Sequence, residues 1–88
     1  LVSGFVNHDA EVFIVTVEPK PEAHKIYKNT HLGQEFNLVL EGSMDLFIGD
    51  KTIRLEEGDS IYFDSGKPHG MLAVGNKAVK FLAFVVEK

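Results

Sequence analysis

Cysteine is absent from this chain of 88 residues, which excludes a disulfide framework, a thiolate metal ligand and a thiol nucleophile. No apolar run approaches the roughly 20 residues that a membrane-spanning helix requires. The first residues also lack a basic segment followed by a hydrophobic stretch, the pattern of a secretory signal. We therefore expect a soluble, cytoplasmic protein.

Positive charge is also scarce. Lys and Arg together number 9 against 13 Asp and Glu, the net charge is −4, and no block of Lys or Arg occurs. A surface that binds nucleic acid needs a basic patch, so any contact with DNA would have to come from a separate domain. The sequence also has no identifiable glycine-rich phosphate loop, Ser-His-Asp set or glycosidase carboxylate pair.

The composition is that of an ordinary globular domain, with 44% hydrophobic and 25% charged residues. A chain of this length folds as one domain with a small core. It opens at Leu1 and enters a strand-like run almost at once. We expect residues 1–88 to be one domain that belongs to a longer chain.

Hydrophobic periodicity favours β-strands, because apolar residues recur at every second position between short polar turns. A two-residue connection, Gly49-Asp50, predicts a tight hairpin. Residues 21–28 form at most a weak strand or one helical turn. Short strands at this spacing predict an all-β barrel or double-sheet roll. The predicted strands cover residues 12–18, 35–40, 44–48, 51–55, 60–63, 71–74 and 79–86.

Three potential metal ligands, His31, Glu35 and His69, lie at the edges of predicted strands and turns. In a small barrel, alternate residues of neighbouring strands point to the interior and converge there. Two imidazoles and a carboxylate suit divalent Fe, Mn, Ni, Cu or Zn and leave positions open for a ligand. Taken singly, each of these residues would more often lie on a surface or in a satisfied core position. Their combined spacing with several glycines predicts a pocket that binds a metal or a small molecule.

The spacing resembles the two motifs of the cupin superfamily. The first motif is matched by His31-x3-Glu35-x6-Gly42, and the second by Gly58-x5-Asp64-x-Gly66-x2-His69. The resemblance implies a single-domain, cupin-type double-stranded β-helix, which is a jelly-roll barrel. It also implies that the two histidines and the glutamate hold a divalent transition metal and that the three glycines form structural turns.

This sequence departs from the cupin pattern at three positions. Asn29 replaces the first histidine of the family, Asp64 replaces a proline and Ala73 replaces the final asparagine. With one imidazole fewer, metal occupancy is left open. The histidines without a motif partner, His8 and His24, are not expected to be ligands. The residues expected to contact a bound small molecule are Asn29, Asn37, Tyr62 and Met71.

A closer similarity concerns residues 31–43 and 58–70, which look like the C-terminal cupin domains of bacterial and archaeal helix-turn-helix regulators. In that group an N-terminal helical domain binds DNA, and the cupin domain senses a small molecule and often dimerises. The resemblance implies a sensor domain preceded by a helix-turn-helix domain.

Two functions from different classes remain open. The favoured one is a small-molecule sensor of a transcriptional regulator, and the alternative is a stand-alone metal-dependent dioxygenase, isomerase or decarboxylase. A structural cupin with a vestigial pocket is a third interpretation. We also expect a homodimer, because the strand-like segments 5–17 and 79–86 would expose unpaired backbone if both were sheet edges.

Overall fold

Antiparallel β-strands make up the regular structure of the part of the chain that the computed structural model describes, residues 10–19, 30 and 33–86. No helix occurs among these residues, so none of them belongs to a membrane-spanning helix. The strands are β1 (Ala10–Val17), β2 (Gln34–Glu41), β3 (Met44–Ile48), β4 (Lys51–Leu55), β5 (Ser60–Asp64), β6 (His69–Ala73) and β7 (Val79–Val86). The all-β prediction is confirmed, whereas the weak element predicted at residues 21–28 lies outside the described residues.

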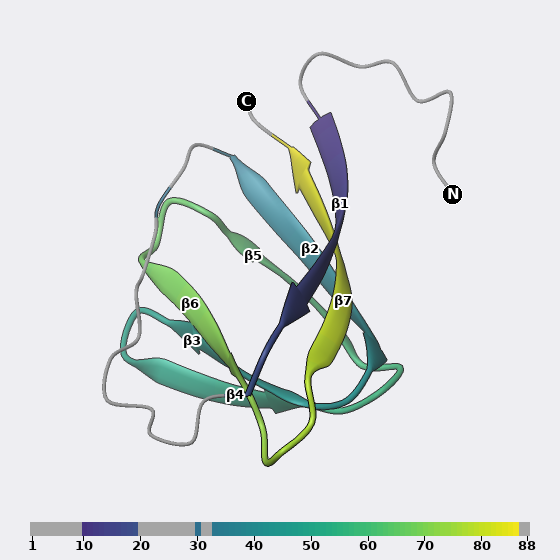
Figure 1. Ribbon diagram of the computed structural model, residues 1–88. Coiled ribbons are helices and arrows are strands. Elements are labelled where there is room, and N and C mark those ends of the chain that lie inside the picture. The colour runs from purple at the N-terminus through teal and green to yellow at the C-terminus, as the bar shows by residue number, and fades with distance from the viewer. Residues whose placement is uncertain (1–9, 20–29, 31–32, 87–88) are drawn as a thin grey trace.

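The strands form two sheets that face each other (Figure 1). One sheet has the order β1-β7-β2-β5 and the other β4-β3-β6, with every neighbouring pair antiparallel. Both sheets contribute to one hydrophobic core, which is what holds a two-layer β-structure together. The buried apolar residues are Val39, Met44, Leu46, Leu55, Phe63, Val79, Phe81 and Ala83.

Alternation along the strands decides which side chains enter the space between the sheets. On β2, Glu35, Asn37 and Val39 are buried, whereas Gln34 and Leu40 are exposed. This is the period of two that a strand imposes on its side chains. Two polar residues of β2 therefore enter the interior beside the apolar core.

Glycine is required at the end of β2. Gly42 has a φ of 81°, and a Cβ built there would lie 2.5 Å from the backbone oxygen of Ala78. Gly58 has a φ of 88° but open space around it. Gly42 lies in the connection between β2 and β3, and Gly58 in the connection between β4 and β5. Gly49 also has a positive φ, 59°, in the predicted hairpin between β3 and β4.

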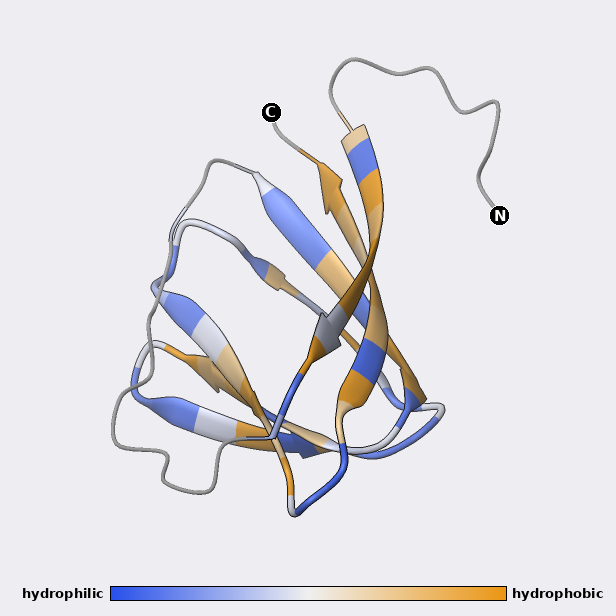
Figure 2. Cartoon of the chain, viewed as in Figure 1, coloured by the Kyte–Doolittle hydropathy of each residue, from blue (hydrophilic) through white to orange (hydrophobic). Residues whose placement is uncertain are grey.

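The expectation that both terminal segments are sheet edges is wrong for β7. This strand lies between β1 and β2 and hydrogen-bonds to both, so its backbone is paired on two sides. Its mostly apolar sequence fits an inner strand (Figure 2). Val79, Phe81 and Ala83 are buried in the core. Among the described residues, β1 is an edge of this sheet.

Candidate functional site

A buried carboxylate and a buried imidazole meet between the two sheets. Glu35 lies near the start of β2, and His69 is the first residue of β6. The Glu35 Oε1 and His69 Nε2 atoms are 3.5 Å apart, and their side chains are only 7% and 6% exposed. Since β2 and β6 belong to different sheets, packing of the sheets creates this pair.

The orientation of the His69 ring is fixed by the turn that precedes it. Its Nδ1 atom lies 2.8 Å from the backbone oxygen of Lys67. A carbonyl oxygen can only accept, so Nδ1 carries a proton and donates. In the neutral ring the lone pair is therefore on Nε2, the atom that faces Glu35. The ring also meets Phe63 edge to face, with centroids 5.1 Å apart.

Asn37, two residues along β2, orients the Glu35 carboxylate. With the amide placed so that its nitrogen faces acceptors, it donates to Glu35 Oε2 at 2.9 Å and to the Phe36 carbonyl oxygen at 3.2 Å. Asn37 is completely buried. A short polar chain thus runs from Asn37 through Glu35 to His69.

This arrangement fits a divalent metal ion. Two ligand atoms that each lie about 2.1 Å from one ion are separated by roughly 3 to 3.5 Å, the separation that Glu35 and His69 have. Metal-bound histidines commonly donate their other ring N–H to a carbonyl, and metal-bound carboxylates are themselves hydrogen-bonded. Both features are present here. If His69 is instead protonated on both nitrogens, the two residues form a buried ion pair.

Comparison with known families agrees with this geometry. Residues 8–85 match the family described as Cupin domain. The chain belongs to the cupin family. The predicted cupin-type fold is thereby confirmed, with the all-β, two-sheet structure of the described residues in agreement. A search of curated proteins found no match.

Several solved structures are similar to this cupin domain. A conserved protein of unknown function from Streptococcus pyogenes has a TM-score of 0.79 and 25% identity, over 94% of this chain and 68% of that one. An HTH_3 family transcriptional regulator from Vibrio cholerae has a TM-score of 0.76 and 30% identity, over 91% of this chain and 44% of the regulator. The Fe(II) form of HppE in complex with substrate has a TM-score of 0.78 and 28% identity, over 88% of this chain and 45% of HppE. The present chain thus spans less than half of the last two proteins.

The structure brings together part of the predicted cupin site. Glu35 and His69 meet, whereas His31 and Asn29 lie outside the described residues, as do His8 and His24. Within residues 10–19, 30 and 33–86, no three His, Asp or Glu side chains form a group suited to a metal. The three-residue set therefore stays a prediction.

The other predicted ligand contacts, Asn37, Met71 and Tyr62, differ in placement. Asn37 lies in the interior beside Glu35. Met71 is half-buried against the core and lies two residues after His69 on β6. The structure does not bring Tyr62 to the site, because its neighbour Phe63 faces inward and Tyr62 therefore points outward.

Tyr62 is 65% exposed on the outer face of the four-stranded sheet. It borders a shallow apolar depression of about 270 Å³ together with Phe36, Phe84 and Val86. The tyrosine thus contributes to an external surface of the cupin domain.

One departure from the cupin pattern has a structural explanation. Asp64 stands where the family has proline, and its Oδ1 accepts a hydrogen bond of 2.8 Å from the Gly66 backbone N–H. This is the turn-stabilising hydrogen bond typical of aspartate. The same turn contains a backbone hydrogen bond of 3.2 Å from the Lys67 N–H to the Asp64 carbonyl oxygen. In the turn before His69, the side-chain hydrogen bond of Asp64 thus restricts the backbone at the position where the family has a proline.

A second depression, of about 350 Å³, lies near the opposite end of β2 from Glu35. It is lined by Gly42, Ser43, Glu56, Glu57, Val74 and Lys77. Its polar groups contact one another: the Gly42 N–H donates to Glu57, Lys77 lies 3.9 Å from the same carboxylate, and Ser43 hydrogen-bonds to Glu56. The carboxylates of Glu56 and Glu57 therefore have a structural role in this depression.

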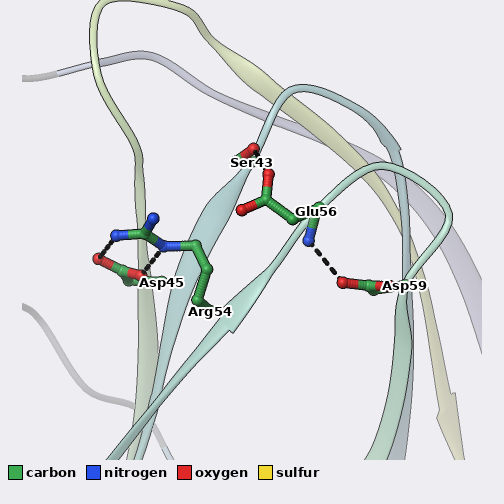
Figure 3. A network of polar contacts seen from close by, with 5 residues as sticks. All are labelled: Ser43, Asp45, Arg54, Glu56 and Asp59. Carbon is green, nitrogen blue, oxygen red and sulfur yellow. Dashed lines mark hydrogen bonds and ion pairs between the residues drawn. The ribbon is translucent and has the colours of Figure 1, made fainter.

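The same polar network continues across the surface (Figure 3). The Glu56 N–H donates to Asp59 at 2.8 Å across the turn between β4 and β5. Arg54 donates to Asp45 on the neighbouring strand, and this hydrogen bond raises the pKa of the guanidinium. These exposed contacts stabilise turns and strand pairs.

Sequence reasoning missed Ser65. This residue is completely buried, and its Oγ atom has no hydrogen-bond partner among the described residues. The signal was present in the alternation, because Ser65 lies two residues after the inward-facing Phe63.

Proposed function

We propose that this cupin domain binds a small molecule between its sheets, with a divalent transition metal held by Glu35, His69 and His31. The observation that carries the proposal is the buried Glu35–His69 pair, in which separate hydrogen bonds orient both groups. The Glu35 Oε1 and His69 Nε2 atoms face each other between the sheets, and a divalent cation shared between them would bind both.

The residues of the chain have distinct parts in such a site. The Lys67 carbonyl holds His69 in the tautomer that presents Nε2 to the interior. Asn37 holds one oxygen of Glu35 and leaves Oε1 toward His69. Phe63 covers one edge of the imidazole and limits access of water. A bound divalent ion would supply Lewis acidity toward oxygen or nitrogen atoms of the ligand.

We propose further that the domain acts as the sensor of a transcriptional regulator. The similarity to the Vibrio cholerae HTH_3 regulator supports this, since the chain spans 44% of that protein at 30% identity. DNA contact would be made in the cytoplasm by a separate N-terminal helix-turn-helix domain. The ligand would regulate DNA binding by having different affinities for two arrangements of the protein.

The similarity to Fe(II) HppE with its substrate favours a second function, a metal-dependent enzyme. The same Glu35–His69 pair would then bind the metal of a catalytic site. The full reading frame around Leu1 discriminates between the two functions. A helix-turn-helix segment upstream supports the sensor, whereas an initiator Met a few residues upstream supports the stand-alone enzyme.

Cobalt binding tests the proposed site. We expect Co(II), titrated into the metal-free protein, to give visible absorption bands that saturate near one equivalent. Glu35→Gln and His69→Ala should weaken binding at least tenfold, since each removes a ligand. Glu41→Gln is the matched control, because Glu41 is exposed at the far end of the same strand. Equal binding by all four proteins would contradict the site.

A homodimer is part of the proposal. The edge strand β1 carries two large exposed apolar residues, Phe13 and Ile14, the second of them 52% exposed. Antiparallel pairing of β1 with the same strand of a second copy would satisfy its outer backbone and form a two-fold interface. Light scattering should give a dimer mass for the natural chain and a monomer mass for Ile14→Lys. A natural chain that is monomeric at micromolar concentration would contradict this.

A further inference from the structure

Ser65 has an unusual environment for a polar side chain. It is 0% exposed, and its Oγ atom makes no hydrogen bond within the part of the chain that the structure describes. Its backbone is satisfied, because the Ser65 N–H donates to the Gly33 carbonyl at 3.0 Å and continues the β2–β5 ladder. The unsatisfied group is therefore the hydroxyl alone. A buried hydroxyl without a partner destabilises a fold, and most such groups are satisfied.

The strand register places this hydroxyl next to the Glu35–His69 pair. Glu35 is directly opposite Phe63, and the ladder extends through Gln34 and Asp64 to Gly33 and Ser65. Ser65 is thus the diagonal neighbour of Glu35 on the same face of the sheet. In antiparallel pairs, such neighbours have Cβ atoms roughly 7 Å apart.

Phe63 on β5 is opposite Glu35 and two residues before Ser65. Its ring contacts His69, and its side chain and that of Ser65 enter the interior from the same strand face. Ser65 and Glu35 thus lie on the inner face of the four-stranded sheet, next to the Phe63 ring that contacts His69.

We infer that Ser65 is a ligand-contacting residue of this site and that its hydroxyl donates a hydrogen bond to a small anion bound beside Glu35 and His69. The inference rests on the proposed function, because a bound divalent cation is what makes an anion favourable next to the Glu35 carboxylate. A hydroxyl donor complements the oxygen or nitrogen acceptor atoms of such an anion. Alanine would fill almost the same volume, so the hydroxyl is the group that carries the interaction.

Azide on the Co(II)-loaded 88-residue chain is a suitable probe, since it is a small anion whose binding changes the visible spectrum of the metal. We expect Ser65→Ala to load Co(II) like the natural chain but to bind azide about tenfold more weakly, the usual effect of losing one hydrogen bond to a charged group. Ser60→Ala is the matched control, because Ser60 is exposed on the same strand and faces outward. It should bind azide like the natural chain.

A second measurement does not use the metal. Urea unfolding of the metal-free Ser65→Ala protein should show a midpoint equal to or higher than that of the natural chain, because the substitution removes an unsatisfied buried hydroxyl. A lower midpoint would mean that the hydroxyl stabilises the fold itself, and this would overturn the assignment.

The outcomes separate the two proposals. Equal azide affinity in Ser65→Ala and the natural chain, with Co(II) bound by both, overturns the role of Ser65 and leaves the metal site intact. Absence of any azide-dependent spectral change in the natural chain also overturns it. Failure of the natural chain to bind Co(II) contradicts the proposed function and the role of Ser65 together.

Discussion

Glu35 Oε1 and His69 Nε2 face each other at 3.5 Å although the two residues belong to different sheets. The pair therefore exists only when the sheets are packed. Each residue is also oriented locally, Glu35 by Asn37 on the same strand and His69 by the Lys67 carbonyl in the preceding turn. Local hydrogen bonds set the direction of each side chain, and the core sets the distance between them.

Asn37→Ala should weaken metal binding without unfolding the domain. The substitution removes the amide that donates to Glu35 Oε2, and loss of such a supporting hydrogen bond typically costs about 10 to 100-fold in metal affinity. Competition titration with a chromophoric chelator measures the effect. Gln34→Ala, on the exposed face of the same strand, is the control. Equal affinities in the two variants would exclude a positioning role for Asn37.

Gly42→Ala should destabilise the fold by about 2 kcal/mol or more, because the residue has a positive φ and its Cβ would collide with the Ala78 backbone oxygen. Gly58 has a comparable φ but open space around it, so Gly58→Ala should lower the free energy of unfolding by only about 1 kcal/mol. Urea unfolding of both variants compares the two costs. A Gly42→Ala protein as stable as Gly58→Ala would show that the Ala78 backbone moves freely.

The sequence predicts the strands because their signal is local. Alternation located every described strand to within two residues. The same signal does not report strand order, which is why β7 was expected at an edge although it pairs on both sides. Strand order depends on long-range pairing that short-range periodicity does not encode.

The candidate site was predictable in part for a similar reason. Motif spacing identified Glu35 and His69, and the structure brings them together. Tyr62 was expected in the pocket on residue type alone, whereas alternation with the inward-facing Phe63 places it outside. Ser65 belongs to no chemical motif; alternation after Phe63 predicts only that its side chain points inward, and the structure adds its complete burial.

Leu46→Ala should be strongly destabilising, by about 3 kcal/mol, because Leu46 is completely buried where the two sheets pack. Leu40→Ala removes the same atoms from an exposed position and should cost less than about 1 kcal/mol. Chemical denaturation monitored by circular dichroism measures both. Similar losses in the two variants would contradict the placement of the core.

Tyr62→Ser should leave Co(II) and azide binding unchanged, since the ring lies on the outer face of the four-stranded sheet. The absorption titrations described for Ser65→Ala provide the comparison. A change of threefold or more in either affinity would mean that Tyr62 communicates with the interior, contrary to the placement of its side chain.

Elemental analysis of the purified chain tests the central claim most directly. Inductively coupled plasma mass spectrometry, before and after equilibration with divalent ions and removal of excess, should find close to one transition-metal ion per chain in the natural protein. His69→Ala should retain little metal while remaining folded by circular dichroism. No retained metal in the natural protein, or equal retention by folded His69→Ala, would contradict a metal site built on Glu35 and His69.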